Sequence, residues 1–498
     1  MEQKYVLGID QGTTGTTMLL IDKQGRIVHK FHQDFAQYYP QPGWVEHDPE
    51  MIWETVRNGL QEITALPEVG PGSLAAIGIT NQRETIVIWD RQTGKPVHPA
   101  IVWQCRRTAG RCTQLMQSGL AKIVQTKTGL KIDPYFSATK IEWLLKNVPG
   151  LKERMQKEEL AAGTIDSWLI WKLTGGKVHA TDYSNASRTM LFNIRELKWD
   201  LELLKLFGIS EQLLPEVRPS ASNFGETTPD LTGVSVPITG ILGDQQAALF
   251  GQGCLEPGSM KNTYGTGCFL LMNTGDRIYL PENGLLTSVA WGLNGKVDYV
   301  LEGSVFVAGA VIQWLRDELG IIQQAADSEA LAFSVNDTNG IYLVPAFTGL
   351  GAPYWDPYAR GLIIGLTRGV NRAHIVRAAL ESIAYQVREV IESLVQTTGS
   401  KPAVLRVDGG AAANNFLLQF QADICDLTIQ RNNSLELTGI GAAFIAGLGS
   451  GFWPDSGELR GLITMESTFS PKMNAIEREK LCHGWNRAVE RSKGWAHE

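Results

Sequence analysis

The sequence predicts an α/β protein built of two domains, and three observations support this prediction. The chain has 498 residues, several times the roughly 100–200 residues of a typical domain. Apolar runs typical of strands alternate with segments of helical periodicity, which implies layers of sheets and helices. Asp10 and Asp244 each follow an apolar run, and they lie almost half a chain apart. We therefore predict two domains, at residues 1–252 and 253–498. The spacing of the two acids is compatible with similar domains, although the sequence shows no strong repeat.

In the first half of the chain, short apolar runs bounded by polar turns predict strands. A polar segment rich in Gly and Thr, residues 10–17, joins the first two runs as a hairpin. Strands are expected at 5–9, at 18–22 and twice within 74–89. Apolar residues also recur with helical periodicity, and helices are expected near 137–147 and 164–173.

The second half repeats the pattern of a strand, an acidic turn and a helix. One such unit spans residues 238–250 and another spans 404–420. The clearest amphipathic helix covers 373–394, because apolar residues recur there at helical spacing. These residues are Val376, Ala379, Ile383, Val387, Val390 and Leu394.

Composition and charge exclude several classes of protein. Hydrophobic residues make up 43% and charged residues 19%, which suits large buried cores and argues against wholesale disorder. The net charge of −7 and the lack of a basic stripe argue against a nucleic-acid partner. The first residues do not form a secretory signal, and no apolar run approaches the roughly 20 residues that span a bilayer. We expect a cytoplasmic protein of enzyme size.

Cysteine and histidine are too sparse to dominate the fold. The six cysteines show no CxxC spacing, and the eight histidines lack the paired spacing of zinc ligands. Glycine is in excess, with 52 of 498 residues, where about 7% is usual. We expect this excess to serve tight turns and close approaches of the backbone.

The Gly/Thr segment 10–17 suits phosphate binding. Glycines allow backbone N–H groups to converge on an anion, and threonine hydroxyls add further donors. The segment lacks the lysine of a P-loop, and it does not open a helix as a Rossmann turn does, which argues against both of those nucleotide sites. An ordinary hairpin turn is the alternative.

Asp10 and Asp244 are the candidate catalytic acids. A carboxylate at the end of a buried strand is costly unless it is hydrogen-bonded or close to a metal. Mg²⁺ is the natural partner of Asp10 if the turn binds a polyphosphate. Asp244 would then accept a proton from an attacking hydroxyl. For each acid taken alone, a strand-end cap is the alternative.

Charged and aromatic side chains predict a pocket for a small polyol. Arg83 and Glu84 follow an apolar strand and together offer hydrogen-bond donors and acceptors, although a surface ion pair is the alternative. Trp103, Tyr135 and Phe269 suit the apolar wall of such a pocket, although core packing is the alternative for each of them.

Small residues mark further places where a flat ligand could approach the backbone. The turns 264–267 and 408–411 are rich in glycine, and hairpin geometry is the alternative there. Gly309 lies inside a helical pattern over 303–315, where glycine costs about 1 kcal/mol relative to alanine. Either close packing or room for a nucleotide explains this glycine.

Together these segments resemble the FGGY family of carbohydrate kinases, which includes glycerol, xylulose and gluconate kinases. The resemblance covers essentially the whole chain, and it implies the fold of actin, hexokinase and Hsp70, with two ribonuclease H-like domains flanking an active-site cleft. The strings that carry it are GIDQGTTGTT (8–17), GITNQRET (78–85), IVWQCRR (101–107), IDPYFSATKIEWLL (132–145), NASRTMLFNI (185–194), GDQQAALFGQ (243–252), KNTYGTGCF (261–269), VPAFTGLGAPYWDPYARG (344–361) and RVDGGAAANNFL (406–417).

The resemblance implies transfer of phosphate from ATP to glycerol, with Mg²⁺ as cofactor, giving sn-glycerol 3-phosphate and ADP as the first step of glycerol catabolism. Asp244 would be the general base and Asp10 would serve the Mg²⁺ shell. The first domain would hold the polyol and the phosphates, and the second would hold the adenine nucleotide. The polyol would contact Arg83, Glu84, Trp103, Tyr135, Asp244, Gln245 and Phe269. The nucleotide would contact Thr13, Thr14, Gly15, Thr266, Gly309, Gln313, Gly410 and Asn414.

Two other functions and the question of regulation stay open at this point. The alternatives are a kinase of another small polyol or ketose, and a non-kinase ATPase or filament module of the same fold. Relatives form dimers and tetramers, so a homodimer or homotetramer is expected. Some bacterial relatives are inhibited by fructose 1,6-bisphosphate at an arginine-bearing loop, but residues 229–236 here contain no arginine and carry Asp230. Residues 218–230 contain no histidine, which argues against a switch by histidine phosphorylation.

Overall fold

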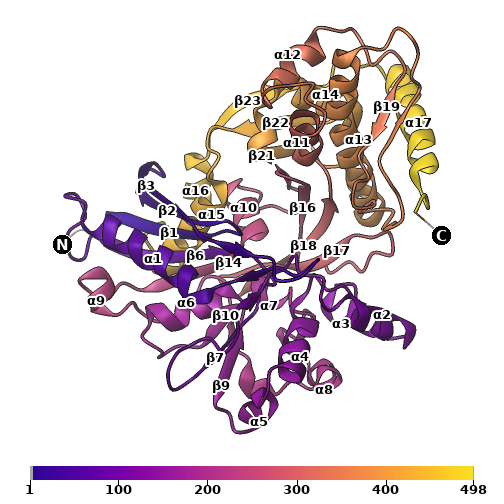
Figure 1. Ribbon diagram of the computed structural model, residues 1–498. Coiled ribbons are helices and arrows are strands. Elements are labelled where there is room, and N and C mark those ends of the chain that lie inside the picture. Colours follow the sequence, from indigo (N-terminus) through magenta and orange to yellow (C-terminus); the bar gives the residue numbers. More distant parts are fainter. Residues whose placement is uncertain (1–3, 497–498) are drawn as a thin grey trace.

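The computed structural model describes residues 4–496 and contains two large β-sheets, one from each half of the chain (Figure 1). In Figure 1 the first half, coloured indigo to magenta, fills the left and the lower part, and most of the orange and yellow second half fills the upper right. Helices and small sheets cover both large sheets, which confirms the predicted α/β class.

The first large sheet has five strands in the order β14-β6-β1-β2-β3. Its strands are β1 (Tyr5–Gln11), β2 (Gly15–Asp22), β3 (Ile27–Asp34), β6 (Leu74–Asn81) and β14 (Ile238–Gly243). β1, β2 and β3 are antiparallel, whereas β6 and β14 run parallel to β1. The predicted hairpin is confirmed, but its turn is shorter than 10–17. Asp10 pairs with Thr17 and Gln11 with Thr16, so that only Gly12–Gly15 lie outside the β1–β2 ladder.

The second large sheet repeats this arrangement and adds a strand at each edge. Its order is β17-β18-β16-β15-β21-β22-β23. β18, β16 and β15 are antiparallel neighbours, and β21 and β22 continue parallel to β15, as β6 and β14 do beside β1. The strands are β15 (Met260–Tyr264), β16 (Cys268–Gly275), β17 (Leu286–Leu293), β18 (Lys296–Val305), β21 (Val404–Asp408), β22 (Thr428–Asn432) and β23 (Met465–Phe469). This shared order supports the prediction of two similar domains.

The helices fall on both sides of these sheets. In the first half they are α1 (Pro49–Thr64), α2 (Ala109–Gln117), α3 (Ala121–Thr128), α4 (Ser137–Asn147), α5 (Leu151–Gln156), α6 (Ile165–Leu173), α7 (Tyr183–Ala186), α8 (Leu201–Phe207), α9 (Pro229–Thr232) and α10 (Asp244–Gly251). In the second half they are α11 (Gly309–Asp317), α12 (Asp327–Phe333), α13 (Arg372–Thr398), α14 (Asn415–Cys425), α15 (Leu437–Ser450), α16 (Ser456–Leu462) and α17 (Ala475–Ser492).

Short strands and 3₁₀ turns complete the structure. The short strands are β4 (Gln37–Tyr38), β5 (Glu46–His47), β7 (Val87–Asp90), β8 (Ala100–Ile101), β9 (Leu160–Gly163), β10 (Ala180–Asp182), β11 (Phe192–Asn193), β12 (Lys198–Trp199), β13 (Glu216–Arg218), β19 (Tyr342–Val344) and β20 (Leu362–Ile364). The 3₁₀ turns are η1 (Glu211–Leu213) and η2 (Gly410–Ala413).

The long helix α13 confirms the amphipathic prediction, since all six of its predicted apolar residues are fully buried. Two other helices differ from their predictions. Gly309 begins α11 instead of lying inside a helix, because the preceding residues 303–305 belong to strand β18. In the predicted unit 404–420, the helix begins only at Asn415, because the 3₁₀ turn η2 follows the strand first.

A row of glycines explains part of the glycine excess. Gly8, Gly78 and Gly240 lie side by side in β1, β6 and β14. A Cβ atom on any of them would lie well under 3.0 Å from backbone atoms of α15, so only glycine permits this close packing. Figure 1 shows the result: α15, coloured as part of the second half, lies against the strands of the first.

Gly78→Ala is expected to destabilise the protein, because its new methyl group would overlap the carbonyl of Ala442. We expect a loss of about 2–3 kcal/mol in the free energy of unfolding, the usual cost of overpacking a core. Gly110→Ala is the control, since Gly110 is exposed in α2 and a Cβ there meets nothing within 4 Å. Denaturant unfolding that gives equal midpoints for the two variants would contradict the packing argument.

Three further findings bear on the sequence predictions. All six cysteines are free thiols. Among the helices of residues 4–496, none combines the length and the apolar composition that spanning a bilayer requires. The division at 252/253 stays a prediction, because α15 follows it in sequence but packs on the first sheet.

Candidate active site

The hairpin β1–β2 carries the first group of predicted site residues. Asp10 lies in β1 and Gly15 begins β2, while Thr13 and Thr14 lie in the turn between them. The turn is closed by the Gly12 amide, which donates to the Gly15 carbonyl at 2.9 Å. Thr14 is exposed and Thr13 is half-buried, so this turn presents hydroxyl groups at the end of the sheet.

Asp10 lies in a strongly acidic environment. Burial, together with the nearby carboxylates of Asp244 and Glu436, raises the pKa of Asp10 to about 8. Neighbouring carboxylates that repel one another in a desolvated site attract a cation. No group of three or more His, Cys, Asp or Glu side chains within residues 4–496 could hold a metal ion alone. A cation here would therefore need oxygen atoms from a ligand as well, which is the usual mode of Mg²⁺ with phosphates.

Arg83 and Asp244 meet where β6 and β14 end. Arg83 is only 2% exposed, and its Nε lies 3.2 Å from Oδ1 of Asp244 at the first turn of α10. The Asp244 side chain keeps 29% of its surface exposed, so a ligand can reach it. Arg83 Nη2 also donates to the Tyr135 hydroxyl at 3.5 Å. The structure thus places three residues predicted for the polyol pocket in contact.

The surface ion pair considered for Arg83 and Glu84 is wrong, because both side chains are buried. Their closest charged atoms are 3.8 Å apart, and each has a stronger partner elsewhere. Glu84 accepts from Arg188 Nε at 2.6 Å. Arg83 donates to both carboxylate oxygens of Glu302, at 2.7 and 3.2 Å, and Arg188 donates to the same carboxylate at 3.0 Å.

These two arginines and two glutamates form a buried, charge-balanced network that joins the halves of the chain. Burial alone would raise the pKa of Glu302, but the guanidinium groups of Arg188 and Arg83 lower this pKa to about 2. Burying such charges is tolerable only when they are paired and hydrogen-bonded. Glu302 comes from β18 of the second sheet, so the position of Arg83 depends on both halves.

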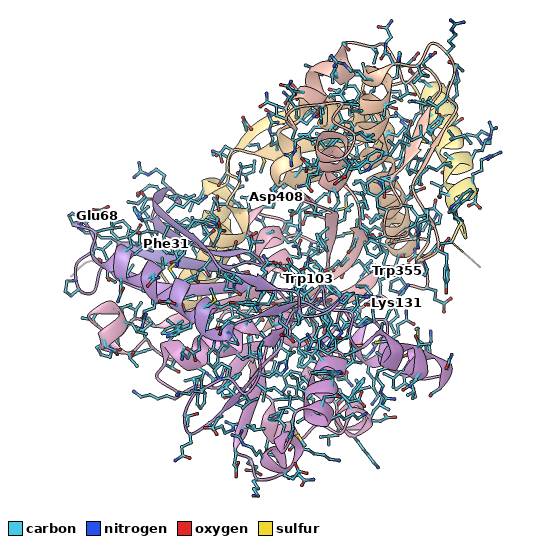
Figure 2. The ribbon with its side chains drawn as sticks, viewed as in Figure 1. Phe31, Glu68, Trp103, Lys131, Trp355 and Asp408 are labelled. Carbon is cyan, nitrogen blue, oxygen red and sulfur yellow. The ribbon has the colours of Figure 1, made fainter. Side chains whose placement is uncertain are left out.

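Aromatic rings lie beside this network. Trp103 and Tyr135 pack edge to face, with ring centroids 5.6 Å apart. The Trp103 indole donates to the Thr13 hydroxyl at 3.0 Å, which links the aromatic wall to the β1–β2 turn. In Figure 2, Trp103 lies in the middle of the molecule, between the two halves. Phe269 is half-buried in β16 of the second sheet, opposite Thr263 of β15.

The backbone of Tyr135 is held by a buried lysine. The ammonium of Lys140 donates to the carbonyl groups of residues 134, 135 and 136 at 2.7, 2.5 and 3.1 Å. The three N–H bonds of the ammonium are thereby matched by three acceptors. This fixes the loop that carries the Tyr135 ring into its place beside Arg83.

Three of the residues predicted for the nucleotide, Thr266, Gly309 and Gly410, lie in turns or at a helix start of the second half. Thr266 is exposed in the β15–β16 turn, and Gly309 at the start of α11 donates to the carbonyl of Gly265 in that turn at 2.9 Å. A Cβ on Gly309 would lie 2.6 Å from the same oxygen, which supports close packing as its explanation. Gly409, beside the exposed Gly410, approaches the backbone of Tyr264 just as closely.

The two remaining predicted nucleotide residues lie on helices. Gln313 is exposed on α11, about one turn after Gly309. Asn414 caps α14 by accepting from the Leu417 amide, and it also donates to Ser328 of α12. The Asn414 side chain therefore already has a structural role.

Sequence reasoning missed Arg188, Glu302, Lys140 and Lys261. The first three appear only as members of apolar or mixed runs, and no local spacing marks them. Lys261 is fully buried in β15 and donates to Oε1 of Gln245 at 2.5 Å. A charged residue in an apolar strand is the one signal that could have singled out Lys261 and Glu302.

Comparison with known proteins places this geometry in a family. The model of the FGGY family of carbohydrate kinases, N-terminal domain, matches residues 5–251, and that of its C-terminal domain matches residues 260–450. The chain belongs to the FGGY family of carbohydrate kinases. It therefore has the two-domain actin/hexokinase-like fold, and ATP is the co-substrate of a kinase of this kind.

Relatives within the family carry a more particular name. The glycerol kinase of Carboxydothermus hydrogenoformans is 60% identical over 99% of both chains, and that of Symbiobacterium thermophilum is 57% identical over the full length of both. A crystal structure of Plasmodium falciparum glycerol kinase with ADP is similar with a TM-score of 0.95, at 39% identity, over 99% of this chain and 98% of that one. A xylulose kinase from Lactobacillus acidophilus has a TM-score of 0.89 at 23% identity, covering 98% of this chain and 97% of that one, which shows the shared fold alone.

Proposed function

We propose that this protein is a glycerol kinase, which transfers the γ-phosphoryl group of ATP to a primary hydroxyl of glycerol and forms sn-glycerol 3-phosphate and ADP. The observation that carries this proposal is the partly exposed Asp244 carboxylate, held beside the buried Arg83. Arg83 also contacts Tyr135, whose ring packs against Trp103. Full-length relatives named glycerol kinase, at 55–60% identity, support the same substrate.

In this proposal the polyol lies against Asp244. The Asp244 carboxylate accepts the proton of the attacking hydroxyl, and Arg83 and Gln245 hold the other hydroxyl groups. Glu84 contributes through its buried carboxylate, which fixes Arg188 and the network behind Arg83. Trp103, Tyr135 and Phe269 cover the carbon chain and exclude water.

The nucleotide in this proposal binds across the glycine-rich turns. Thr13, Thr14 and Gly15 face the phosphates from the first sheet, while Thr266, Gly309, Gln313, Gly410 and Asn414 line the nucleotide from the second. Phosphoryl transfer gains most of its rate from positioning and from charge neutralisation. Two halves that enclose the reacting groups also keep water from attacking ATP.

Mg²⁺ is the proposed cofactor, and the residues present fit it. Asp10 lies among carboxylates whose mutual repulsion a cation relieves. The part of the chain that the structure describes offers no group of three protein ligands that would hold the ion without the phosphates. Asp10 would hold the ion, which would neutralise charge on the transferred phosphate. The chain's own residues then position the hydroxyl and accept its proton.

Asp10→Asn is expected to raise the Mg²⁺ concentration for half-maximal activity by about 10- to 100-fold, as loss of an outer-shell ligand does. The glycerol KM should change little, because Asp10 lies on the phosphate side of Asp244 in this proposal. Asp230→Asn is the matched control, since Asp230 is exposed in the short helix α9. An Asp10→Asn enzyme with an unchanged Mg²⁺ titration would remove Asp10 from the ion's shell.

A substrate panel tests the proposed function. ADP release is coupled to an optical assay and measured with glycerol, dihydroxyacetone, xylulose and gluconate at saturating Mg²⁺-ATP. Glycerol should give the highest kcat/KM. Turnover of xylulose or gluconate without turnover of glycerol would favour another kinase of the family instead.

Other properties stay predictions. They are the cytoplasmic location, the homodimeric or homotetrameric assembly, and the lack of regulation by fructose 1,6-bisphosphate or by histidine phosphorylation. Repeating the substrate panel with added fructose 1,6-bisphosphate tests regulation by that compound, and we expect no inhibition.

A further inference from the structure

Lys261 occupies an unusual place between the two halves of the site. It lies on β15, and its side chain is fully buried. Residues 261 and 263 share one face of the strand, and the Lys261 ammonium bonds Oγ1 of Thr263 at 2.8 Å and Oε1 of Gln245 at 2.5 Å. The bond to Gln245 links a strand of the second sheet to the helix that begins with Asp244.

Keeping a buried lysine here is costly. Burial lowers the pKa of Lys261 to about 8, although the carboxylates of Asp408 and Asp244 oppose that shift. An apolar side chain would fill the same strand position without this cost. The lysine is therefore better explained by its hydrogen bonds than by packing.

The bond between Lys261 and Gln245 fixes the direction of the Gln245 amide. An ammonium has no lone pair, so the amide atom facing it must be the carbonyl oxygen. The NH₂ group then lies at the other branch of the amide, and no protein acceptor for it is found within residues 4–496. Gln245 is half-exposed, so this NH₂ group is left for a ligand.

The neighbouring Gln246 makes the contrast clear. Its carbonyl oxygen accepts from Arg83 at 3.2 Å, and its NH₂ group donates to the carbonyl of Val289 at 3.1 Å. Gln246 is fully buried, and protein groups use both ends of its amide. Of these two adjacent glutamines, only Gln245 keeps one end unused.

We propose that Lys261 is a positioning residue that sets the hydrogen-bonding polarity of the polyol pocket. It holds the Gln245 carbonyl so that the Gln245 NH₂ group donates to one substrate oxygen, while Asp244 accepts from the attacking hydroxyl. This inference rests on the proposed function. Without Lys261 the amide can rotate, and it loses its fixed role as a donor to the substrate.

A double-mutant cycle tests this proposal. Lys261→Met removes the donor but keeps the length of the side chain, and it should raise the glycerol KM about 5- to 10-fold, as expected for one lost hydrogen bond. In a Gln245→Leu background the same substitution should change the KM less than about 2-fold, because the residue through which Lys261 acts is gone. Lys296→Met, at an exposed lysine of the same sheet, is the control, and it should leave the glycerol KM unchanged.

A second variant keeps the proposal testable if Lys261→Met does not fold. Gln245→Glu preserves a partner for Lys261, because the new carboxylate pairs with the ammonium, but it removes the NH₂ donor. Its glycerol KM should rise about 10-fold or more with an unchanged melting temperature. An unchanged KM would overturn the proposal.

The remaining outcomes separate this inference from the proposed function. An equal rise in glycerol KM when Lys261→Met is made in the wild-type and Gln245→Leu backgrounds, or no rise in either, would overturn the role of Lys261 alone. A wild-type enzyme that does not phosphorylate glycerol would overturn the proposed function, and this inference with it.

Discussion

Asp244→Asn should lower kcat for glycerol phosphorylation by about 10²- to 10⁴-fold, the usual contribution of a general base. Asparagine keeps the shape of the side chain, and its oxygen can still accept from the backbone N–H of Gln245, as Asp244 does at 2.7 Å. It cannot take up the proton of the attacking hydroxyl. The loss should therefore appear in kcat, whereas ATP binding, measured by calorimetric titration, should stay unchanged.

The pH dependence gives an independent check on Asp244. Burial raises the pKa of Asp244, and Arg83, the backbone N–H of Gln245 and Lys261 offset only part of this rise. A base works only when it is ionised, so kcat should fall on acidification at a higher pH than an ordinary aspartate would give. An Asp244→Asn enzyme with a rate near that of the wild type would show that another group takes the proton.

Arg83→Ala should raise the glycerol KM by about 100-fold or more. In the proposed complex, Arg83 Nε and Nη2 exchange their long contacts with Asp244 and Tyr135, at 3.2 and 3.5 Å, for two substrate hydroxyls. Losing these two hydrogen bonds from a charged donor costs about 1.5 kcal/mol or more each. The substitution also leaves the buried Glu302 with only Arg188 as its arginine partner, which should lower the free energy of unfolding by about 3–5 kcal/mol. Glycerol kinetics and denaturant unfolding measure the two effects separately.

Arg111→Ala is the matched control for Arg83→Ala. Arg111 also pairs with a buried glutamate, Glu142, at 2.8 Å, but it lies on α2 and is 32% exposed. Its loss should leave the glycerol KM unchanged. A glycerol KM that is equally insensitive to Arg83→Ala would place Arg83 outside the polyol pocket.

Much of the fold could be predicted from the sequence, because its signals are local. The hairpin at the N-terminus, the strand before Asp244 and the long helix α13 all follow from apolar runs and their periodicity. Gly309 was misplaced because a strand end and a helix start follow one another without a break in the apolar pattern. The duplication of the sheet became clear only from the order of the strands.

The candidate site was predicted less completely, because its strongest interactions are not local. Arg83 and Glu302 lie 219 positions apart, and neither residue reveals the other in the sequence. Lys261 lies on strand β15 and Gln245 on helix α10, and only the fold brings their side chains together. The sequence could suggest which residues touch a ligand, but it could not show which other residues hold these ligand-contacting side chains in place.

The most direct test of the account is the amount of sn-glycerol 3-phosphate formed per ADP released by the purified protein with Mg²⁺-ATP and glycerol. The two products can be measured in one reaction, the first with a stereospecific dehydrogenase. The account predicts equal amounts, with little ADP release when glycerol is absent. ADP release that is unaffected by glycerol, and that yields no sn-glycerol 3-phosphate, would contradict it.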